Sequence, residues 1–309
     1  MSHFDHLYCR NKVISALWEH YYRQVPFAAT IEKAFAARGD LWIEDHVAFR
    51  TLPGVHCGMH ILQKLFEWLG YERRDDYDFK EKKLKAFWMA PKDNDAPTKD
   101  VAPKIFISEL QPESFSPAFQ ECLSEIAAQW QESPLSKLEA LATQGTATDK
   151  PTRQDQFVAS AVALLTQGPS WARPTHRIYN ILKEESDYAA WTYLFGHQIN
   201  HFTVSAHLTD SFSELNEMGT FIESELKIEM NHSGGLVKGT AELLLEQIAT
   251  MAAQVPVYFQ EGVQDISYGF VEFAKRYPLK GKTSDGHWHS YYQGFVAANA
   301  DKIFESTYK

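Results

Sequence analysis

Hydrophobic and polar residues alternate between helical and strand spacing along the first part of the chain. Residues 10–36 carry apolar residues at helical spacing, and Pro26 interrupts the run, which predicts two helices. Apolar and polar positions then alternate over residues 41–52, as is typical of a strand. In residues 58–70 the apolar positions again recur at helical spacing and form a single stripe. This pattern ends at Gly70, so a helix is predicted there.

Short strand-like segments follow this helix, and a long helical region follows them. The strands are predicted at residues 71–77, 84–91 and 103–110. Together with the preceding strand and helix they make a β-α-β-β-β unit over residues 37–110. Residues 111–197 have helical spacing broken by polar and proline-containing links, which indicates a helical insertion.

The order of elements in the first unit recurs in the last third of the chain. The predicted elements are a strand at 198–208, a helix at 210–226, a short strand from Lys227, and strands at 255–262 and 265–277. The stretch between Gly239 and Gln254 predicts an additional helix inserted into this second unit. The two units share an order of elements and have no literal sequence repeat.

This order of elements predicts the fold class. Two β-α-β-β-β units whose strands curve around a shared cavity make an α+β fold with a central metal or ligand site. We therefore predict a single catalytic domain over residues 1–309. It comprises a first unit at 37–110, a helical insertion at 111–197 and a second unit at 198–309.

Composition narrows the class of protein further. Of the 309 residues 44% are hydrophobic and 14% aromatic, which is enough material for a buried core and excludes global disorder. A net charge of −10 argues against a nucleic acid partner. No apolar run approaches the ~18 residues needed to cross a bilayer, and the N-terminus lacks the apolar stretch of a signal peptide. We therefore expect a cytoplasmic globular protein that binds no membrane.

Several common catalytic signatures are missing from the chain. It contains no GxSxG, GxxxxGK[ST], HExxH or GxGxxG segment. These absences argue against an α/β-hydrolase, a P-loop NTPase, a zincin protease and a dinucleotide-dependent dehydrogenase. The three cysteines are too few and too scattered for a disulfide framework or a zinc knuckle.

His46 and Arg50 are polar residues in a strand that is otherwise suited to burial. Their spacing of four residues puts both side chains on one strand face, with Cα atoms ~13 Å apart. Across that distance they can hold the two ends of a small elongated acid, because the arginine fork binds a carboxylate bidentately. Alternatively, His46 is a hydrogen-bonded core histidine and Arg50 pairs with a protein carboxylate such as Glu44.

His201 and Glu272 lie at comparable places in the second unit. His201 is in its first strand, as His46 is in the first strand of the first unit, and its strand face is unusually polar. Such a face is either exposed to solvent or lines a wet cavity. Glu272 lies among aromatic residues in the last strand, where a buried carboxylate needs a positive partner. Either Arg276 or a metal ion supplies that charge.

Two histidines and one carboxylate from separate strands form the ligand set of many non-haem Fe(II) oxygenases, which leaves half of an octahedral ion open. Zinc tolerates the same ligands, so the set alone does not fix the metal. Other histidine pairs compete for this role, namely His56 with His60, His197 with His207, and His287 with His289. Glu109 occupies the place in the first unit that corresponds to Glu272 and is a competing carboxylate.

Three segments resemble the signature segments of a known family. They are DHVAFRT at 45–51, INHFT at 199–203 and YGFVEFAKR at 268–276, and they resemble the family first catalogued as DUF1338. Its characterised members are 2-oxoadipate dioxygenase/decarboxylases of lysine catabolism. The HxxxR element at 46–50 is the most specific part of the resemblance, which runs from about residue 10 to the C-terminus.

The resemblance implies a vicinal-oxygen-chelate-like core, a mononuclear Fe(II) and no separate organic co-substrate. Carried over residue by residue, it implies His46, His201 and Glu272 as metal ligands and Arg50 as the catalytic anchor of a substrate carboxylate. The implied reaction takes a 2-oxo dicarboxylic acid and O2. It converts 2-oxoadipate to 2-hydroxyglutarate and CO2, with both oxygen atoms entering one substrate.

Because of the strand face that they share with other candidates, and on that ground alone, three further residues are expected to contact the substrate, namely Ser205, Tyr268 and Arg276.

Two other classes of function stay open at this stage. A vicinal-oxygen-chelate isomerase or lyase would use zinc or nickel as a Lewis acid and consume no oxygen. A non-catalytic protein that sequesters a metal or an organic acid would need no open coordination position.

Overall fold

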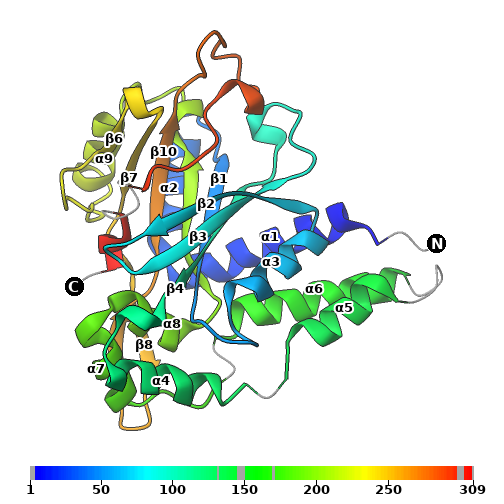
Figure 1. The fold of residues 1–309 in the computed structure, drawn as a ribbon. Helices are drawn as coiled ribbons and strands as arrows, with labels where there is room; N and C mark the ends of the chain where they lie inside the picture. Colours follow the sequence, from blue (N-terminus) through cyan, green and yellow to red (C-terminus); the bar gives the residue numbers. More distant parts are fainter. Residues whose placement is uncertain (1–3, 131, 145–149, 169–170, 298–302, 308–309) are drawn as a thin grey trace.

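Strands form the centre of the protein. The computed structural model describes residues 4–130, 132–144, 150–168, 171–297 and 303–307. Within these ranges eight strands form one sheet in the order β2-β3-β4-β1-β5-β10-β7-β6 (Figure 1). The strands of this sheet are β1 (Glu44–Thr51), β2 (Tyr71–Phe79), β3 (Leu84–Pro91), β4 (Lys104–Leu110), β5 (Ile199–Ser205), β6 (Lys238–Thr240), β7 (Leu245–Ala249) and β10 (Phe270–Arg276).

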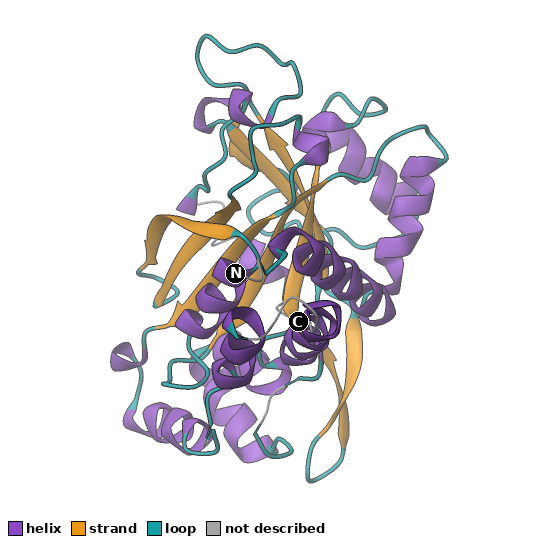
Figure 2. Cartoon of the chain, turned by 90° about the vertical axis from the view of Figure 1, so that its right-hand side faces the viewer, coloured by secondary structure: helices purple, strands orange, loops and turns teal. Residues whose placement is uncertain are grey.

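The sheet has two halves of the same topology, joined where β1 pairs antiparallel with β5. β4 runs parallel to β1, and β10 runs parallel to β5. β3 and β7 are then the antiparallel neighbours of β4 and β10, and β2 and β6 form the outer edges. The predicted pair of β-α-β-β-β units in one α+β sheet is thereby confirmed, and Figure 2 shows the curvature of this sheet.

Helices pack around the sheet and connect its strands. The crossover helix of the first half is α3 (Met59–Trp68), and that of the second half is α9 (Leu215–Ser224). The other helices are α1 (His6–Gln24), α2 (Pro26–Ala36), α4 (Pro117–Ala127), α5 (Leu135–Thr143), α6 (Lys150–Thr166), α7 (His176–Glu185) and α8 (Asp187–Phe195). Helices α5 and α6 lie beside α1 and α3, and α8 contacts β1 (Figure 1).

Two local features of the N-terminal part of the chain follow directly from its sequence. Pro26 begins α2 at a position where its missing N–H costs nothing, which explains the break between α1 and α2. Gly70 has a φ of +85° immediately after α3 and lets the chain turn into β2.

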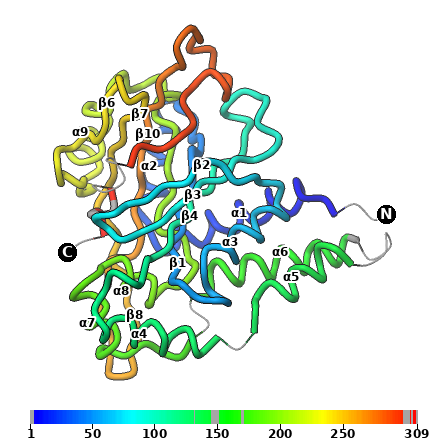
Figure 3. Tube along the Cα trace, in the orientation of Figure 1, coloured from blue at the N-terminus to red at the C-terminus, as the bar shows by residue number. Residues whose placement is uncertain are grey.

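The start of α1 and residues 303–307 lie on opposite sides of the molecule in Figure 3. No helix within the described ranges is long and apolar enough to cross a membrane.

The short strand predicted from Lys227 is wrong, because Met230 forms an isolated β-bridge with Thr250 there and no strand is present at 227–237. The predicted helix between Gly239 and Gln254 is wrong as well. That stretch contains strands β6 and β7, separated by a single 3-10 turn at Ala241–Leu243. Leu244 adopts a left-handed φ of +60°, which ends that turn. The residues that follow pair with β10 inside the sheet, so tertiary pairing overrides the helical preference of the leucine-rich run.

The segment predicted as one strand at 265–277 is divided in two. Its first part belongs to β9 (Val263–Ser267), which pairs with β8 (Gln254–Tyr258) in a separate hairpin that projects from the body of the protein in Figure 2. Its second part is β10. Gly269 lies at the break, where an added Cβ would meet the Tyr21 hydroxyl at 2.8 Å and the Asn200 carbonyl at 2.9 Å. The close approach of the backbone to α1 and β5 therefore requires glycine.

Strand β5 separates an apolar face from a polar one. Phe202 points towards the N-terminal helices and stacks on Trp18 with ring centroids 3.7 Å apart. The neighbouring residues His201 and Thr203 point to the other face, although both are almost completely buried. The sheet therefore buries a polar surface opposite its hydrophobic core, which calls for a functional explanation.

Candidate metal centre

The three residues predicted as metal ligands come together in the structure. His46, His201 and Glu272 each offer a ligand atom, and these atoms lie within 4.8 Å of one another. Each of the two imidazole Nε2 atoms is 3.6 Å from one oxygen of the Glu272 carboxylate. All three side chains are buried.

Strand register explains this convergence. β5 lies between β1 and β10, and Thr203 of β5 pairs with His46 on one side and Glu272 on the other. His201 is two residues before Thr203 and therefore shares its face of the sheet. Three adjacent strands thus bring one ligand each to the same place, at the junction of the two halves.

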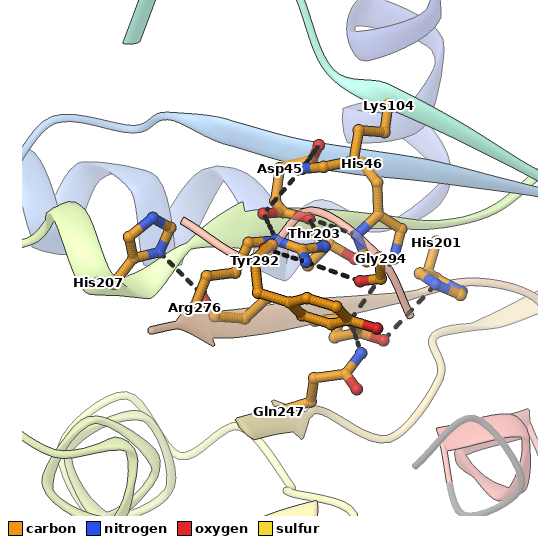
Figure 4. A network of polar contacts seen from close by, with 12 residues as sticks. Asp45, His46, Lys104, His201, Thr203, His207, Gln247, Arg276, Tyr292 and Gly294 are labelled. Carbon is orange, nitrogen blue, oxygen red and sulfur yellow. Dashed lines mark hydrogen bonds and ion pairs between the residues drawn. The ribbon is translucent and has the colours of Figure 1, made fainter. Parts of the chain in front are cut away.

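Hydrogen bonds orient all three side chains. His46 donates from Nδ1 to Asp45 at 2.8 Å, and His201 donates from Nδ1 to the side-chain oxygen of Asn200 at 3.0 Å. Both histidines therefore present Nε2 towards Glu272. Figure 4 shows His46 and His201 in this polar network, together with Asp45 and Gln247. Gln247 donates from Nε2 to Glu272 Oε1 at 2.6 Å.

Burial favours the neutral imidazole of His201 and leaves the Glu272 carboxylate in need of a compensating positive charge. Burial lowers the pKa of His201 well below its usual range, and the neighbouring His46 and Arg50 add to this shift. Burial also raises the pKa of Glu272, against the opposing effect of His46. Neutral imidazoles are the ligating form, and a buried carboxylate gains from a bound cation that compensates its charge. The residues present therefore fit a divalent metal ion.

Asp45 lies behind His46 and is itself held by two cations. Arg276 donates to both carboxylate oxygens of Asp45, at 2.6 and 2.8 Å, and Lys104 Nζ lies 3.3 Å from Oδ2. Although burial favours the protonated acid, these two cations keep the pKa of Asp45 well below its usual range. A charged carboxylate therefore supports His46 from the side opposite Glu272.

Arg50 lies on the same side of β1 as His46, and both line one cavity. The residues that line this cavity are His46, Ala48, Phe49, Arg50, Phe106, Ser108, Asn200, His201, Gln247, Glu272, Phe295 and Ile303. Arg50 is 1% exposed, and its guanidinium lies over the rings of Tyr188 and Trp191 at 5.2 and 5.1 Å. Glu44, the alternative partner, accepts a hydrogen bond from Trp18 instead.

The three substrate-binding residues expected from strand facing do not reach this cavity. Tyr268 precedes the break at Gly269, and its hydroxyl donates to Gln198. Arg276 lies four residues along β10 from Glu272, a separation of ~13 Å, and pairs with Asp45 instead of Glu272. Ser205 is buried at the end of β5, and none of the three lines the cavity. A shared strand face therefore does not by itself show that a side chain lines a given cavity.

The competing residues have structural partners instead. His197 donates from Nε2 to the Cys57 carbonyl at 2.7 Å, and His207 donates from Nδ1 to the Ala274 carbonyl at 3.3 Å. The carboxylate of Glu109 accepts the Met59 N–H at the start of α3. Within the described ranges, none of His56, His60, His197, His207, His287, His289 and Glu109 joins a group of three metal-binding side chains.

His197 leads to a prediction about stability and pH. Burial lowers the pKa of His197 to about 4, so the folded protein takes up this proton less readily than the unfolded chain, whose histidines have a pKa of about 6.5. The stability that neutral His197 allows is complete above pH ~6.5 and is lost as the pH falls towards 4. We expect His197→Gln to flatten the fall in the free energy of unfolding across this window.

Urea unfolding at a series of pH values measures this effect. His289 is exposed, so His289→Gln is the matched control and is expected to leave the pH dependence unchanged. Equal slopes for the wild-type protein and His197→Gln between pH 6.5 and 4 would show that His197 does not contribute to acid destabilisation.

Comparison with known proteins places this site in a family. The model of the family described as 2-oxoadipate dioxygenase/decarboxylase matches residues 13–289. The chain belongs to this family. A 2-oxoadipate dioxygenase/decarboxylase of Oryza sativa, named as chloroplastic/amyloplastic, is 33% identical over 306 residues, which cover 96% of this chain and 78% of the relative.

Solved structures agree with the family and with the fold. The hydroxyglutarate synthase of Oryza sativa in complex with 2-oxoadipate has a TM-score of 0.76 and 31% identity, with 96% of this chain and 91% of the other covered. A glyoxalase-superfamily protein of Ralstonia eutropha JMP134 has a TM-score of 0.69 at 21% identity, with 85% and 81% covered, and shows the fold alone. The vicinal-oxygen-chelate-like fold predicted for this dioxygenase/decarboxylase family member is confirmed.

Proposed function

We propose that this protein is an Fe(II)-dependent dioxygenase/decarboxylase that converts 2-oxoadipate and O2 to 2-hydroxyglutarate and CO2. The observation that carries the proposal is the buried group of two histidines and one glutamate beside a cavity that Arg50 also lines. Membership of the family supports the reaction, and the rice hydroxyglutarate synthase solved with 2-oxoadipate supports the substrate.

His46, His201 and Glu272 are the residues that would hold the iron. When bound, the metal supplies open coordination positions at which a 2-oxo acid and O2 react. The protein's own contribution is to present two imidazole Nε2 atoms and one carboxylate in a buried place. Gln247 keeps the Glu272 carboxylate in position through its hydrogen bond to Oε1.

Arg50 and the cavity wall select and orient the acid. The Arg50 guanidinium is a bidentate donor for a carboxylate, and it lines the same cavity as the ligand group. A dicarboxylate that reaches the metal site with its 2-oxo end can therefore place its other carboxylate on Arg50. Between the two ends the wall is formed by Ala48, Phe106 and Phe295, which suit a methylene chain and keep water away.

A second functional class keeps specific support from the fold. The glyoxalase-superfamily likeness is compatible with an isomerase or lyase that uses its metal as a Lewis acid. The family match favours the oxygen-consuming reaction instead. The rice relative is named as a plastid protein, so the cytoplasmic location expected from the sequence stays a prediction.

Oxygen consumption distinguishes these functions. Apoprotein is first reconstituted with Fe(II) under anaerobic conditions. On addition of O2 and 2-oxoadipate, without 2-oxoglutarate, we expect one O2 to be consumed and one CO2 to be released per 2-oxoadipate. Because both oxygen atoms enter one molecule, ¹⁸O2 should place both labels in 2-hydroxyglutarate. An oxygen electrode and mass spectrometry of the product measure the two quantities.

The contrary outcomes are equally definite. Undiminished turnover of 2-oxoadipate without O2 would assign the protein to the isomerase or lyase class. Stoichiometric metal with no conversion of 2-oxoadipate, in the presence or absence of O2, would assign it to a binding function. Label in only one product oxygen would exclude the intramolecular dioxygenase reaction.

A further inference from the structure

A buried ionic cluster lies directly behind the ligand His46. Asp45 forms its centre, Arg276 and Lys104 are its cations, and all three side chains are at most 2% exposed. Figure 4 shows Asp45 between the imidazole of His46 and the guanidinium of Arg276. Burying a carboxylate with a guanidinium and an amine is costly and rarely improves stability over apolar residues of similar volume. Their presence beside a metal ligand therefore points to a role other than stability.

The backbone of β1 is irregular where the cluster forms. Glu44 pairs with Val204 and His46 pairs with Thr203, so Asp45 has no partner in the register with β5. This is a β-bulge, a feature that changes the direction of side chains and often lies next to active sites. It allows Asp45 to reach back to Nδ1 of the adjacent His46 while it faces Arg276.

Arg276 also contacts the C-terminal part of the chain. Its Nη1 donates to the backbone carbonyls of Tyr292 and Gly294, at 3.0 and 2.8 Å. The next residue is Phe295, whose ring meets the ring of His46 edge-on at 4.8 Å between centroids. Phe295 also lines the cavity beside the ligand group. A single guanidinium therefore holds both the support of His46 and the segment that forms the cavity wall.

We propose that Asp45 is a positioning residue for the metal ligand His46, and that Arg276 links it to the segment that carries Phe295. The proposal rests on the metal site proposed above. A carboxylate that accepts from Nδ1 fixes the imidazole tautomer with a free electron pair on Nε2, and it increases the basicity of that ligand. Arg276 fixes the carboxylate through a bidentate pair, which single-point lysine contacts cannot reproduce.

Metal affinity tests the role of Asp45 without any need for turnover. We expect Asp45→Asn to weaken Zn²⁺ binding to the apoprotein by about 10- to 100-fold, measured by competition with a chromogenic chelator. The visible spectrum of the Co²⁺-substituted protein should change at the same time, because the donor strength and orientation of one ligand change. Wild-type Zn²⁺ affinity and an unchanged Co²⁺ spectrum in Asp45→Asn would overturn this part of the proposal.

Two controls separate positioning from folding. The triple variant Asp45→Leu, Lys104→Met, Arg276→Met removes the whole cluster, so it should fold without uncompensated charge and still bind Zn²⁺ as weakly as Asp45→Asn. Arg10→Met breaks an ion pair away from the site, in which the buried Arg10 contacts the exposed Asp93 with two hydrogen bonds of 2.6 Å. It should lower the Tm and leave Zn²⁺ affinity unchanged. A triple variant that folds and binds Zn²⁺ normally would refute the positioning role.

The link to Phe295 needs a separate measurement. Arg276→Lys keeps a cation near Asp45 but cannot also reach the carbonyls of Tyr292 and Gly294. Its main effect should therefore be on substrate binding. We expect its KM for 2-oxoadipate to rise on the order of 10-fold while Zn²⁺ affinity changes less than in Asp45→Asn. Phe295→Ala should raise KM in the same way. An unchanged KM in Arg276→Lys would overturn the link.

These tests separate the inference from the proposed function. Zn²⁺ competition and the Co²⁺ spectrum need no turnover, so they decide the role of Asp45 even if the wild-type protein does not oxidise 2-oxoadipate. In that event the binding of 2-oxoadipate to the Co²⁺ protein, followed in the visible spectrum, replaces KM for Arg276→Lys and Phe295→Ala.

Discussion

Replacing His46, His201 or Glu272 with alanine is expected to abolish stoichiometric iron binding and turnover. Each residue supplies one of the three ligand atoms that lie within 4.8 Å of one another. The loss of a direct ligand should exceed the 10- to 100-fold loss of affinity that is typical when a supporting residue is changed. Iron analysis after anaerobic reconstitution, with O2 consumption on the same samples, measures both effects.

Folding controls make this prediction specific. The three residues line a cavity, so alanine leaves the surrounding packing largely in place, and circular dichroism should show an unchanged fold. His197→Ala is the matched control, because it removes a buried imidazole that is hydrogen-bonded to the Cys57 carbonyl and is not part of the ligand group. It should lower the Tm and retain full iron. Normal iron content in any of the three alanine variants would remove that residue from the ligand set.

Replacing Arg50 is expected to impair substrate binding and leave iron content unaltered. Arg50 lines the cavity with the ligand group but is not one of its members. Loss of a charge-assisted pair in a desolvated pocket costs about 2–5 kcal/mol, which corresponds to about 30- to 5,000-fold in kcat/KM. Arg50→Lys should not restore activity, since a point charge cannot replace the planar fork.

The second carboxylate of the substrate provides an internal comparison for Arg50. A 2-oxo monocarboxylic acid of the same length lacks the group that Arg50 is expected to bind, so Arg50→Ala should reduce the preference of the enzyme for the dicarboxylate. If Arg50 only stabilises the fold through the rings of Tyr188 and Trp191, kcat/KM stays normal and the Tm falls. That result would leave the second carboxylate of the substrate without an assigned partner.

Much of the site was accessible from local sequence patterns. His46 and Arg50 share a strand face because their spacing is even, and the structure places both at one cavity. The same argument located His201 and Glu272 on buried strands. It failed for Tyr268 and Arg276, since a strand pattern shows neither the break at Gly269 nor the pairing of Arg276 with Asp45 on another strand.

The supporting residues were not identified from the sequence, although one signal was present. Asp45 is one of the alternating positions of the first strand, and a charged residue next to a proposed ligand is a signal for a supporting carboxylate. Lys104 and Gln247 gave no such signal. They meet the site through β4 and β7, and sheet order brings these strands together without leaving a local trace in the chain.

By itself the sequence determined the first β-α-β-β-β unit, the opening strand and helix of the second, and the polar positions on the first strand of each. It could do so because side-chain alternation is a local property of the backbone, set by neighbours in the chain. Tertiary structure alone decided that β5 lies between β1 and β10, so that Thr203 pairs with both His46 and Glu272. It also decided that residues 245–249 form a strand, because pairing with β10 outweighs the helical preference of a leucine-rich run.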